Sequence, residues 1–365
     1  MKISRIHSQL LRLPADEPLA DGPAVPGATR EFVALTVETD QGLDGIGVTF
    51  FGGALTGALK TAVDSLGALI IGEDPLRNEA IVDRLRTAAG MSGPGGVFTL
   101  ALAAIDIALW DIKGKAYNQP LARLVGGLRD RVPTYASGAL MRHMPLEHVA
   151  QAAPRLVKRG FRQMKMQLAL PGDTSPEREL ERARIVRESI GSGIDLMCDI
   201  NQRWSVHQAI DLGRRLEGIH LFWLEDVTTH DDYAGLARVT QALTTPVAGG
   251  EYVYGITPFR HMLEARSVDI VMIDVLRVGG ITQWLKVAGM AEAFNLPVVS
   301  HLLPEIHVHL IAGVRNGLTV EYMPWAMRLF EEGPVLDRGE LVVPDRPGLG
   351  LKFDRGALAR FAVSG

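Results

Sequence analysis

The sequence predicts an α/β protein in which a closed barrel of alternating strands and helices follows a smaller α+β region. Two observations predict the barrel. Eight short apolar or β-branched runs between Val132 and Met323 alternate with helix-length segments, which favours a parallel sheet, and eight such units suggest closure. Seven of the eight runs also have an ionisable residue at or near their C-terminal end. The earlier part of the chain lacks this alternation and indicates strands followed by helices.

The α+β region is predicted to contain strands at residues 3–13, 32–39 and 45–50 and helices at 54–71, 77–90 and 97–116. The turn signal Thr39-Asp40-Gln41-Gly42 separates the second strand from the third. Two stretches rich in Gly or Pro, residues 14–29 and 51–53, are expected to be loops, and loops on a rigid scaffold often contact ligands. The tail after Pro324 is too short for a domain, so we expect it to pack back on the N-terminal part.

The barrel strands are predicted from runs that end close to a polar side chain. In chain order the runs are VPTYAS, FRQMKM, IDLMCDI, LFWLED, TPVAGGE, DIVMID, LPVVSH and LTVEYM. Because the C-terminal ends of parallel barrel strands meet at one mouth, their polar side chains are expected to converge there.

Composition excludes several classes of protein. The 365 residues are 47% hydrophobic with a formal net charge of −4, and no basic block interleaves with aromatics, so nucleic acid is not an expected partner. The single cysteine, Cys198, excludes an internal disulfide. No apolar stretch is long enough to cross a bilayer and the N-terminus lacks a signal-peptide core, so we expect a soluble cytoplasmic protein without a membrane partner.

Three acids predict a metal site. Asp199, Glu225 and Glu251 end three successive strands and are equally spaced in the sequence. Carboxylates on adjacent strands, about 4.8 Å apart, repel one another unless a cation lies between them. Oxygen ligands without Cys or His favour Mg²⁺, with Mn²⁺ as an alternative, at one ion per subunit.

The next two strands predict an acid/base pair. A carboxylate at Asp274 beside an imidazole at His301 would fix the tautomer of the ring and raise its basicity, as a general base requires. Lys165 and Gln167 should point the same way from the second strand. Lys165 would then either serve the site or form an ion pair with Asp199.

Four further residues are candidates. Glu321 ends the eighth strand and, if protonated, could donate to a developing oxyanion. The alternative is a rim carboxylate paired with an arginine. Asn201, Ser137 and Tyr135 are predicted, with Gln167, to contact the substrate.

The chain resembles the mandelate racemase subgroup of the enolase superfamily over nearly its whole length. The matching segments are residues 101–127, GFRQMKMQ (160–167), DINQRW (199–204), WLED (223–226), GGE (249–251), MIDVLRVGG (272–280), VVSHLLPEIHVHL (298–310) and LTVEYM (318–323). The resemblance implies a modified TIM barrel, (β/α)₇β, at residues 126–325, an α+β capping domain at 1–125, and a C-terminal segment at 326–365 that packs back on the capping domain. It also implies a homo-oligomer, from dimer to octamer.

The resemblance further implies Mg²⁺ held by Asp199, Glu225 and Glu251, and enolate formation from a carboxylate substrate. His301 with Asp274 would be the general acid/base, while Lys165 and Glu321 would stabilise the enolate. Two positions depart from the family. Gln167 replaces a second lysine that acts as the base on the face opposite the histidine, and Glu225-Asp226-Val227 replaces Glu-Glu-Pro.

Because Gln167 cannot take a proton, two-base racemisation is disfavoured. The sequence therefore favours a hydro-lyase that removes water from a sugar acid to give a 2-keto-3-deoxy acid. An epimerase or racemase, or a lactone cycloisomerase, acting through the same enolate is the alternative enzyme. A barrel that binds Mg²⁺ and a carboxylate without catalysis is the alternative of another class.

Overall fold

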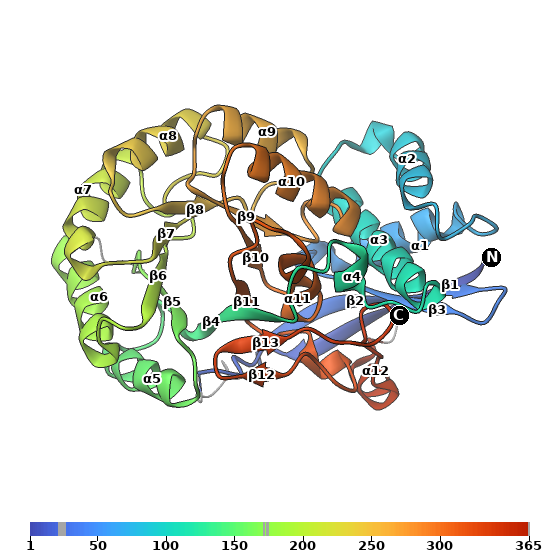
Figure 1. Ribbon diagram of the computed structural model, residues 1–365, viewed down its shortest axis with the longest axis horizontal. Coiled ribbons are helices and arrows are strands. Elements are labelled where there is room, and N and C mark those ends of the chain that lie inside the picture. Colours follow the sequence, from blue (N-terminus) through green and yellow to red (C-terminus); the bar gives the residue numbers. More distant parts are fainter. Residues whose placement is uncertain (21–26, 171, 173–174, 364–365) are drawn as a thin grey trace.

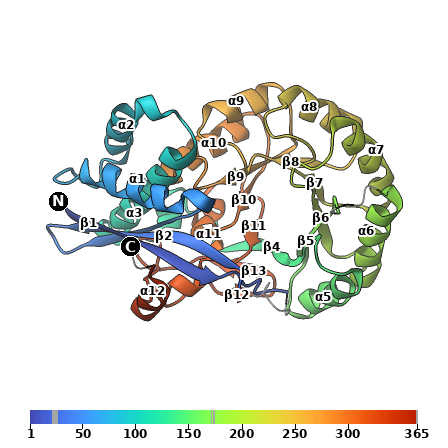
Figure 2. The same cartoon turned by 180° about the vertical axis from the view of Figure 1, so that it is seen from behind.

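A computed structural model describes residues 1–20, 27–170, 172 and 175–363. A curled parallel barrel lies beside a smaller sheet-and-helix region that holds the N-terminus, and the C-terminus lies on that smaller region (Figures 1 and 2). This arrangement confirms the predicted barrel with an α+β cap. Within the described residues, no helix is both long enough and apolar enough to cross a membrane.

The cap consists of a three-stranded antiparallel sheet, in the order β1-β2-β3, covered by helices. Its elements are β1 (Ile3–Pro14), β2 (Thr29–Thr39), β3 (Asp44–Thr49), α1 (Thr56–Ala68), α2 (Asn78–Ala88), α3 (Gly96–Ala116) and α4 (Leu121–Leu124), with short 3₁₀ turns η1 (Gly53–Leu55) and η2 (Gly90–Ser92). All six elements predicted for this region are present. Strand β2 begins earlier than expected, at Thr29, inside the stretch predicted as a loop, and residues 21–26 of that stretch lie outside the described residues.

The sheet packs directly on α3, and glycine makes the close contact possible. A Cβ added at Gly45 or Gly47 of β3 would lie 2.1 Å or 2.0 Å from the carbonyl oxygens of Ala108 or Ala104. Such separations are far below van der Waals contact, so only glycine allows β3 to approach the backbone of α3 this closely.

Across the described part of residues 131–322, the barrel contains eight parallel strands joined by seven helices, which is the (β/α)₇β order that the resemblance implied. The strands are β4 (Arg131–Leu140), β5 (Gln163–Gln167), β6 (Asp195–Asp199), β7 (Trp223–Glu225), β8 (Val247–Gly249), β9 (Ile270–Asp274), β10 (Val298–His301) and β11 (Val320–Tyr322). The helices are α5 (Leu146–Lys158), α6 (Pro176–Ile190), α7 (Val206–Leu216, followed by η3, Glu217–Ile219), α8 (Tyr233–Ala242), α9 (Thr257–Glu264), α10 (Ile281–Ala293) and α11 (Pro304–Gly313).

Barrel closure depends on β11. This strand pairs in parallel with β4, and beside it the Leu318 amide donates to the Val298 carbonyl of β10 at 2.9 Å. Inside the barrel, Tyr135, Met197, Trp223, Met272 and Val299 form a compact buried cluster beneath the mouth. The barrel is therefore filled with side chains, and open space for chemistry lies at the ends of its strands.

The cap is attached to the rest of the chain by two fully buried carboxylates of α3. Asp106 accepts hydrogen bonds from the backbone nitrogen and hydroxyl of Thr282 in the first turn of α10, at 2.8 and 2.6 Å. Asp111 accepts from the amides of Ile46 and Leu349 at 3.0 and 2.8 Å. These bonds join the cap to the barrel and to the C-terminal segment.

The C-terminal segment contains η4 (Met327–Leu329), β12 (Leu336–Asp337), β13 (Glu340–Val342) and α12 (Arg355–Phe361). Strand β13 pairs antiparallel with β4, and the Val363 amide donates to the Leu10 carbonyl of β1 at 3.0 Å. The segment therefore contacts both the barrel and the cap.

Candidate active site

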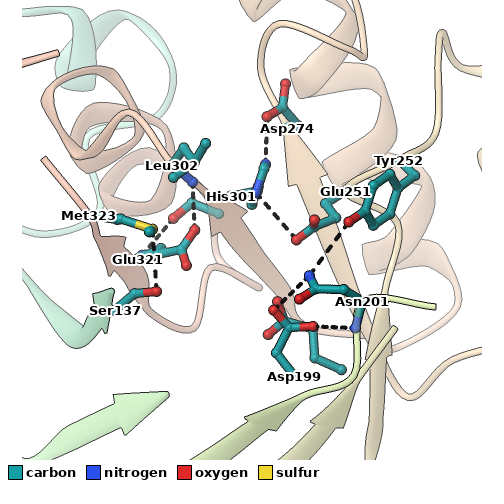
Figure 3. Close-up of polar contacts among 12 residues, drawn as sticks. Ser137, Asp199, Asn201, Glu251, Tyr252, Asp274, His301, Leu302, Glu321 and Met323 are labelled. Carbon is teal, nitrogen blue, oxygen red and sulfur yellow. Dashed lines mark hydrogen bonds and ion pairs between the residues drawn. The ribbon is translucent and has the colours of Figure 1, made fainter. Parts of the chain in front are cut away.

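The ionisable side chains at the strand ends gather at one mouth of the barrel. Lys165, Asp199, Glu225, Glu251, Asp274, His301 and Glu321 are all buried. Lys165 comes from β5, and Asp199, Glu225, Asp274 and His301 are each the last residue of a strand. Figure 3 shows His301 between Asp274 and Glu251, with Asp199 and Glu321 facing the same space.

Two of the three predicted metal ligands lie side by side. Carboxylate oxygens of Asp199, Glu225 and Asp226 are all within 4.8 Å of one another, so this buried acidic group is able to bind a metal ion. Glu251 lies farther round the mouth, where its Oε2 is 3.3 Å from His301 Nε2. Asp226 was not predicted as a ligand. It has a left-handed backbone, φ 45°, at the position that departs from the family motif.

The carboxylates at the mouth carry more negative charge than Lys165 and His301 compensate. Burial raises the pKa of Glu225 well above its usual range, Lys165 opposes the shift, and Asp199 and Glu251 add to it. Burial also raises the pKa of Glu251, to about 7, although His301 opposes the shift. The buried oxygens Asp226 Oδ2 and Glu251 Oε2 have no hydrogen-bond partner among the described residues. A divalent cation fits this set of oxygen donors.

Lys165 lies among the acids and remains charged. Its Nζ is 2.5 Å from Glu225 Oε1, 2.9 Å from Glu321 Oε1 and 3.9 Å from Asp199 Oδ2. The ion pair considered from the sequence is therefore present, but Asp199 is the most distant of the three partners. Burial alone would lower the pKa of Lys165. The negative charges of Glu225 and Glu321 have a larger effect and raise that pKa well above its usual range. The Lys165 ammonium is therefore placed to stabilise negative charge at the mouth.

His301 and Asp274 form the predicted pair. The two residues are in register on β10 and β9, and His301 Nδ1 is 2.7 Å from Asp274 Oδ2. Asp274 Oδ1 also accepts from the amides of Leu276 and Arg277. Burial would lower the pKa of His301, but Glu251 and Asp274 outweigh it and raise the pKa. Since Asp274 holds the proton on Nδ1, Nε2 is the nitrogen presented to the site.

Glu321 is arranged as an acceptor, which corrects the suggested role of a protonated donor. Its Oε1 lies against Lys165, and its Oε2 accepts from the Leu302 amide at 2.7 Å. Burial would raise the pKa of Glu321, but Lys165 and then His301 lower it to about 2. The ionised carboxylate holds Lys165 in place. Its partner is a lysine, where the sequence alternative named an arginine.

The side of the mouth opposite His301 is built from amides. Gln167 Nε2 donates to Asn201 Oδ1 at 3.1 Å, and Asn201 Nδ2 donates to Asp199 Oδ2 at 2.8 Å. Arg142 donates to Asn201 Oδ1 at 2.6 Å, while Asn201 Nδ2 lies 3.5 Å from the Tyr252 hydroxyl. Gln167 and Asn201 therefore lie at the site as predicted, and neither can take a proton.

Arg142 and Tyr252 are site residues that the sequence reasoning missed. The first barrel run was predicted to end at Ser137, whereas β4 continues to Leu140 and so carries Arg142 to the mouth. Extending that run through its next apolar residues would have found the arginine. Tyr252 directly follows Glu251, and no periodic signal marks it.

Tyr135 is the clearest correction among the substrate contacts. It is fully buried in the barrel interior, its hydroxyl donates to the Ser300 carbonyl at 3.3 Å, and its ring packs edge-on against Trp223. No surface is left for a substrate. Ser137 lies higher on β4 but is also buried, and its hydroxyl is 3.5 Å from Met323 Sδ (Figure 3).

The cap completes the mouth. The Phe51 ring stacks on the His301 ring, with centroids 6.0 Å apart. The Arg277 guanidinium lies 3.9 Å from the centroid of the Phe51 ring. A cavity of about 570 Å³ lies beside it, lined by residues that include Arg30, Phe50, Phe51 and Trp325. Arg30 lies over the Trp325 ring and pairs with Glu17, so both predicted loops reach this region.

The capped barrel has a cluster of carboxylates, a lysine and a His-Asp pair at its mouth. This combination is typical of enzymes that form enolates. Residues 147–357 match the sequence family described as enolase C-terminal domain-like. Residues 25–126 match the mandelate racemase/muconate lactonizing enzyme N-terminal domain. The chain belongs to the enolase superfamily, in its mandelate racemase subgroup.

Relatives of this chain include sugar-acid dehydratases and cycloisomerases. It is 34% identical to 3,6-anhydro-alpha-L-galactonate cycloisomerase of Streptomyces coelicolor, over 99% of both chains. It is 29% identical to L-talarate/galactarate dehydratase of Salmonella typhimurium, over 98% of this chain and 90% of the other. The crystal structure of L-talarate dehydratase from Polaromonas sp. JS666, complexed with Mg and L-glucarate, has a TM-score of 0.91 at 30% identity and covers 100% of this chain and 98% of that one.

Proposed function

We propose that this enzyme removes the α-proton of a sugar acid and then eliminates water, giving a 2-keto-3-deoxy acid. The observation that carries the proposal is the asymmetry of the mouth. One side presents His301 Nε2, with Asp274 behind the ring, and the other presents the amides of Gln167 and Asn201. A single acid/base group suits an elimination, in which the proton removed from carbon is returned to the leaving oxygen.

The proposed metal is Mg²⁺, held by Asp199, Glu225 and Glu251, with Asp226 within reach of the first two. When bound, Mg²⁺ supplies positive charge beside the substrate carboxylate, where charge develops as the α-proton leaves. The Lys165 ammonium is placed to stabilise the same charge, and Glu321 fixes its position at 2.9 Å. Interactions that strengthen as charge develops lower the barrier rather than merely tighten binding.

The elimination requires only His301 as base and acid, and the later conversion of the enol to the keto form takes its C3 proton from solvent and returns the enol hydroxyl proton to it. Its Nε2 takes the C2 proton, and the electrons of the C2–H bond enter the enolate. The enolate then expels the C3 hydroxyl, which accepts the same proton from the imidazolium and leaves as water. The resulting enol becomes the 2-keto acid. Asp274 keeps the ring oriented throughout, through the 2.7 Å contact to Nδ1.

Gln167 is proposed to bind a substrate hydroxyl. Its amide can donate and accept hydrogen bonds, and Asn201 and the Arg142 backbone hold it in position. The family's second lysine would instead place a base on this side. The replacement therefore favours one-base chemistry over racemisation.

The similarity to a 3,6-anhydrogalactonate cycloisomerase favours a second candidate. In an anhydro sugar acid the oxygen on C3 belongs to a ring, so the same elimination opens the ring and loses no water. The two candidates differ only in whether the leaving oxygen remains attached to the product.

The test is a panel of aldonic, aldaric and 3,6-anhydro-aldonic acids incubated with the protein and Mg²⁺ and read by mass spectrometry. We expect products lighter than the substrate by one water, formed by the native protein and not by His301→Asn. An isomer of unchanged mass formed from an anhydro acid would support the cycloisomerase. Absence of any product across the panel would reject both and favour a barrel that binds without catalysis.

A further inference from the structure

A second cavity lies between the cap and the outside of the barrel. Its volume is about 580 Å³, and its lining includes Asn78 of α2, Trp110 and Lys113 of α3, and Leu285 and Lys286 of α10. Both views of the fold show α2, α3 and α10 next to one another (Figures 1 and 2). The lining shares no residue with the barrel mouth described above, so the cavity is not part of the active site.

Asn78 provides the first indication of a ligand. Its side chain is 4% exposed, and neither its amide oxygen nor its amide nitrogen has a hydrogen-bond partner among the described residues. A buried amide without partners is costly, and native structures rarely leave one. A bound group that offers both a donor and an acceptor, as a hydroxyl does, would satisfy it.

Charge provides the second indication. The Lys113 ammonium lies 4.6 Å from the centroid of the Trp110 ring, and Asp106 and Glu79 act on it through space without forming an ion pair with it among the described residues. Lys286 is paired with Glu79 at 2.8 Å, which neutralises the acid on the cavity wall. Helix α2 begins at Asn78 with no side chain capping its first turn, so its positive end adds to the field.

The wall provides the third indication. Leu76, Leu285 and the half-buried Trp110 form an apolar surface beside these polar groups. An indole face suits the C–H groups of a sugar-like chain, whereas an isolated phosphate would leave this surface without contacts.

We propose that this cavity binds a small polyhydroxy carboxylate. The carboxylate lies against Lys113 and the first turn of α2, a hydroxyl pairs with Asn78, and the carbon chain rests on Trp110. Such a ligand contacts both α3 of the cap and α10 of the barrel. The inference does not depend on the reaction proposed above, because no residue of the mouth takes part.

Calorimetric titrations of the full chain test the site, with D-galactonate, inorganic phosphate and the neutral polyol galactitol as probes. Loss of the charged contact in Lys113→Met should weaken D-galactonate binding about tenfold or more, and loss of the neutral hydrogen bond in Asn78→Leu should weaken it about fivefold. Lys60→Met is the matched control, because Lys60 is a lysine of α1 paired with Asp64 away from the cavity. It should leave the affinity unchanged. Binding at the barrel mouth appears as a component that none of the three variants alters.

Melting curves of the unliganded proteins provide a second measurement. Asn78→Leu removes an unsatisfied amide at similar volume, so its melting temperature should equal or exceed that of the native protein. A fall would mean that the protein itself satisfies the amide and would overturn the proposal. So would the absence of any Lys113-dependent binding at millimolar D-galactonate, or equal binding of galactitol or phosphate.

Discussion

Phe51 of the cap stacks on His301 of the barrel, with the two ring planes within 11° of parallel. Phe51 holds this position with φ at 70°, in the left-handed region that bulky residues rarely adopt. The backbone cost of such a conformation is about 1–2 kcal/mol, so the contact is maintained against strain. The proposed base is therefore covered by a residue from the other structural unit, and cap docking is part of building the site.

This relationship predicts the effect of replacing Phe51 with glycine. Glycine relieves the backbone strain but loses the ring contacts with Phe50, His301 and Arg277 and gains freedom in the unfolded chain, so the melting temperature should fall. The imidazole loses its cover, so kcat/KM should fall about tenfold or more, which corresponds to about 1.4 kcal/mol. Steady-state kinetics and a melting curve on the same preparation check both parts. Unchanged kcat/KM would mean that the stack has no role in catalysis.

Asp274→Asn tests the orientation of the imidazole. An asparagine can hold the ring but favours the wrong tautomer, so kcat should fall by about 10³-fold to 10⁴-fold while the fold is kept. Asp274→Glu keeps the charge and should retain more activity than Asp274→Asn. If the asparagine variant were as active as the native protein, Asp274 would have no part in setting the proton on His301.

Mg²⁺ affinity distinguishes two possible sets of metal ligands, which share Asp199 and Glu225 and differ in whether the third ligand is Glu251 or Asp226. We expect Glu251→Gln to weaken Mg²⁺ binding by about 100-fold, or about 3 kcal/mol, because a charged oxygen ligand is lost. Asp226→Asn should weaken it much less, since Asp226 stands outside the proposed set. Calorimetric titration with Mg²⁺ measures both constants. The reverse order would assign Asp226 to the metal in place of Glu251.

His309 predicts how stability depends on pH. The ring is fully buried in α11, its Nδ1 accepts from the Ala122 amide, and its Nε2 donates to the Leu349 carbonyl. Burial lowers the pKa of His309 to about 4, against an ordinary value of 6.5. Between pH 4 and pH 6.5 the unfolded chain binds a proton on His309 that the folded chain does not. The contribution of His309 to the free energy of unfolding is therefore full above pH 6.5 and is lost as the pH falls towards 4.

The size of this loss is about 3 kcal/mol at most. Urea unfolding at pH 7 and at pH 4.5 measures it, and His309→Gln is the comparison because glutamine can keep a donor and an acceptor without titrating. The difference between the two pH values should be smaller in the glutamine variant. An equal difference in both proteins would place the pH dependence elsewhere.

Much of the fold could be predicted because it depends on local patterns. Strand runs, helix-length intervals and the residue at each strand end are properties of short segments, and these placed Lys165, Asp274 and His301 at the mouth. Gln167 and Asn201 followed from the same rule. The pairing of Asp274 with His301 required only that successive strands be neighbours.

The remaining features depend on distant parts of the chain or on local backbone geometry that no pattern encodes. The Phe51–His301 stack requires the cap to dock on the barrel. The ion pairs of Lys165 with Glu225 and Glu321 depend on which side chain reaches farthest across the mouth. Tyr135 was assigned to the substrate because its run was predicted to end too early, so a residue deep in the barrel was taken for one at the rim.

The most direct test of the central claim is exchange of the substrate's C2 proton in D₂O, followed by proton NMR. For a sugar acid that the protein accepts, the account predicts loss of the C2 signal, or deuterium in the product, only when Mg²⁺ is present and His301 is intact. It also predicts reaction at one C2 configuration and not at its mirror configuration, because Gln167 offers no base. Exchange that persists in His301→Asn, or that occurs equally at both configurations, would contradict it.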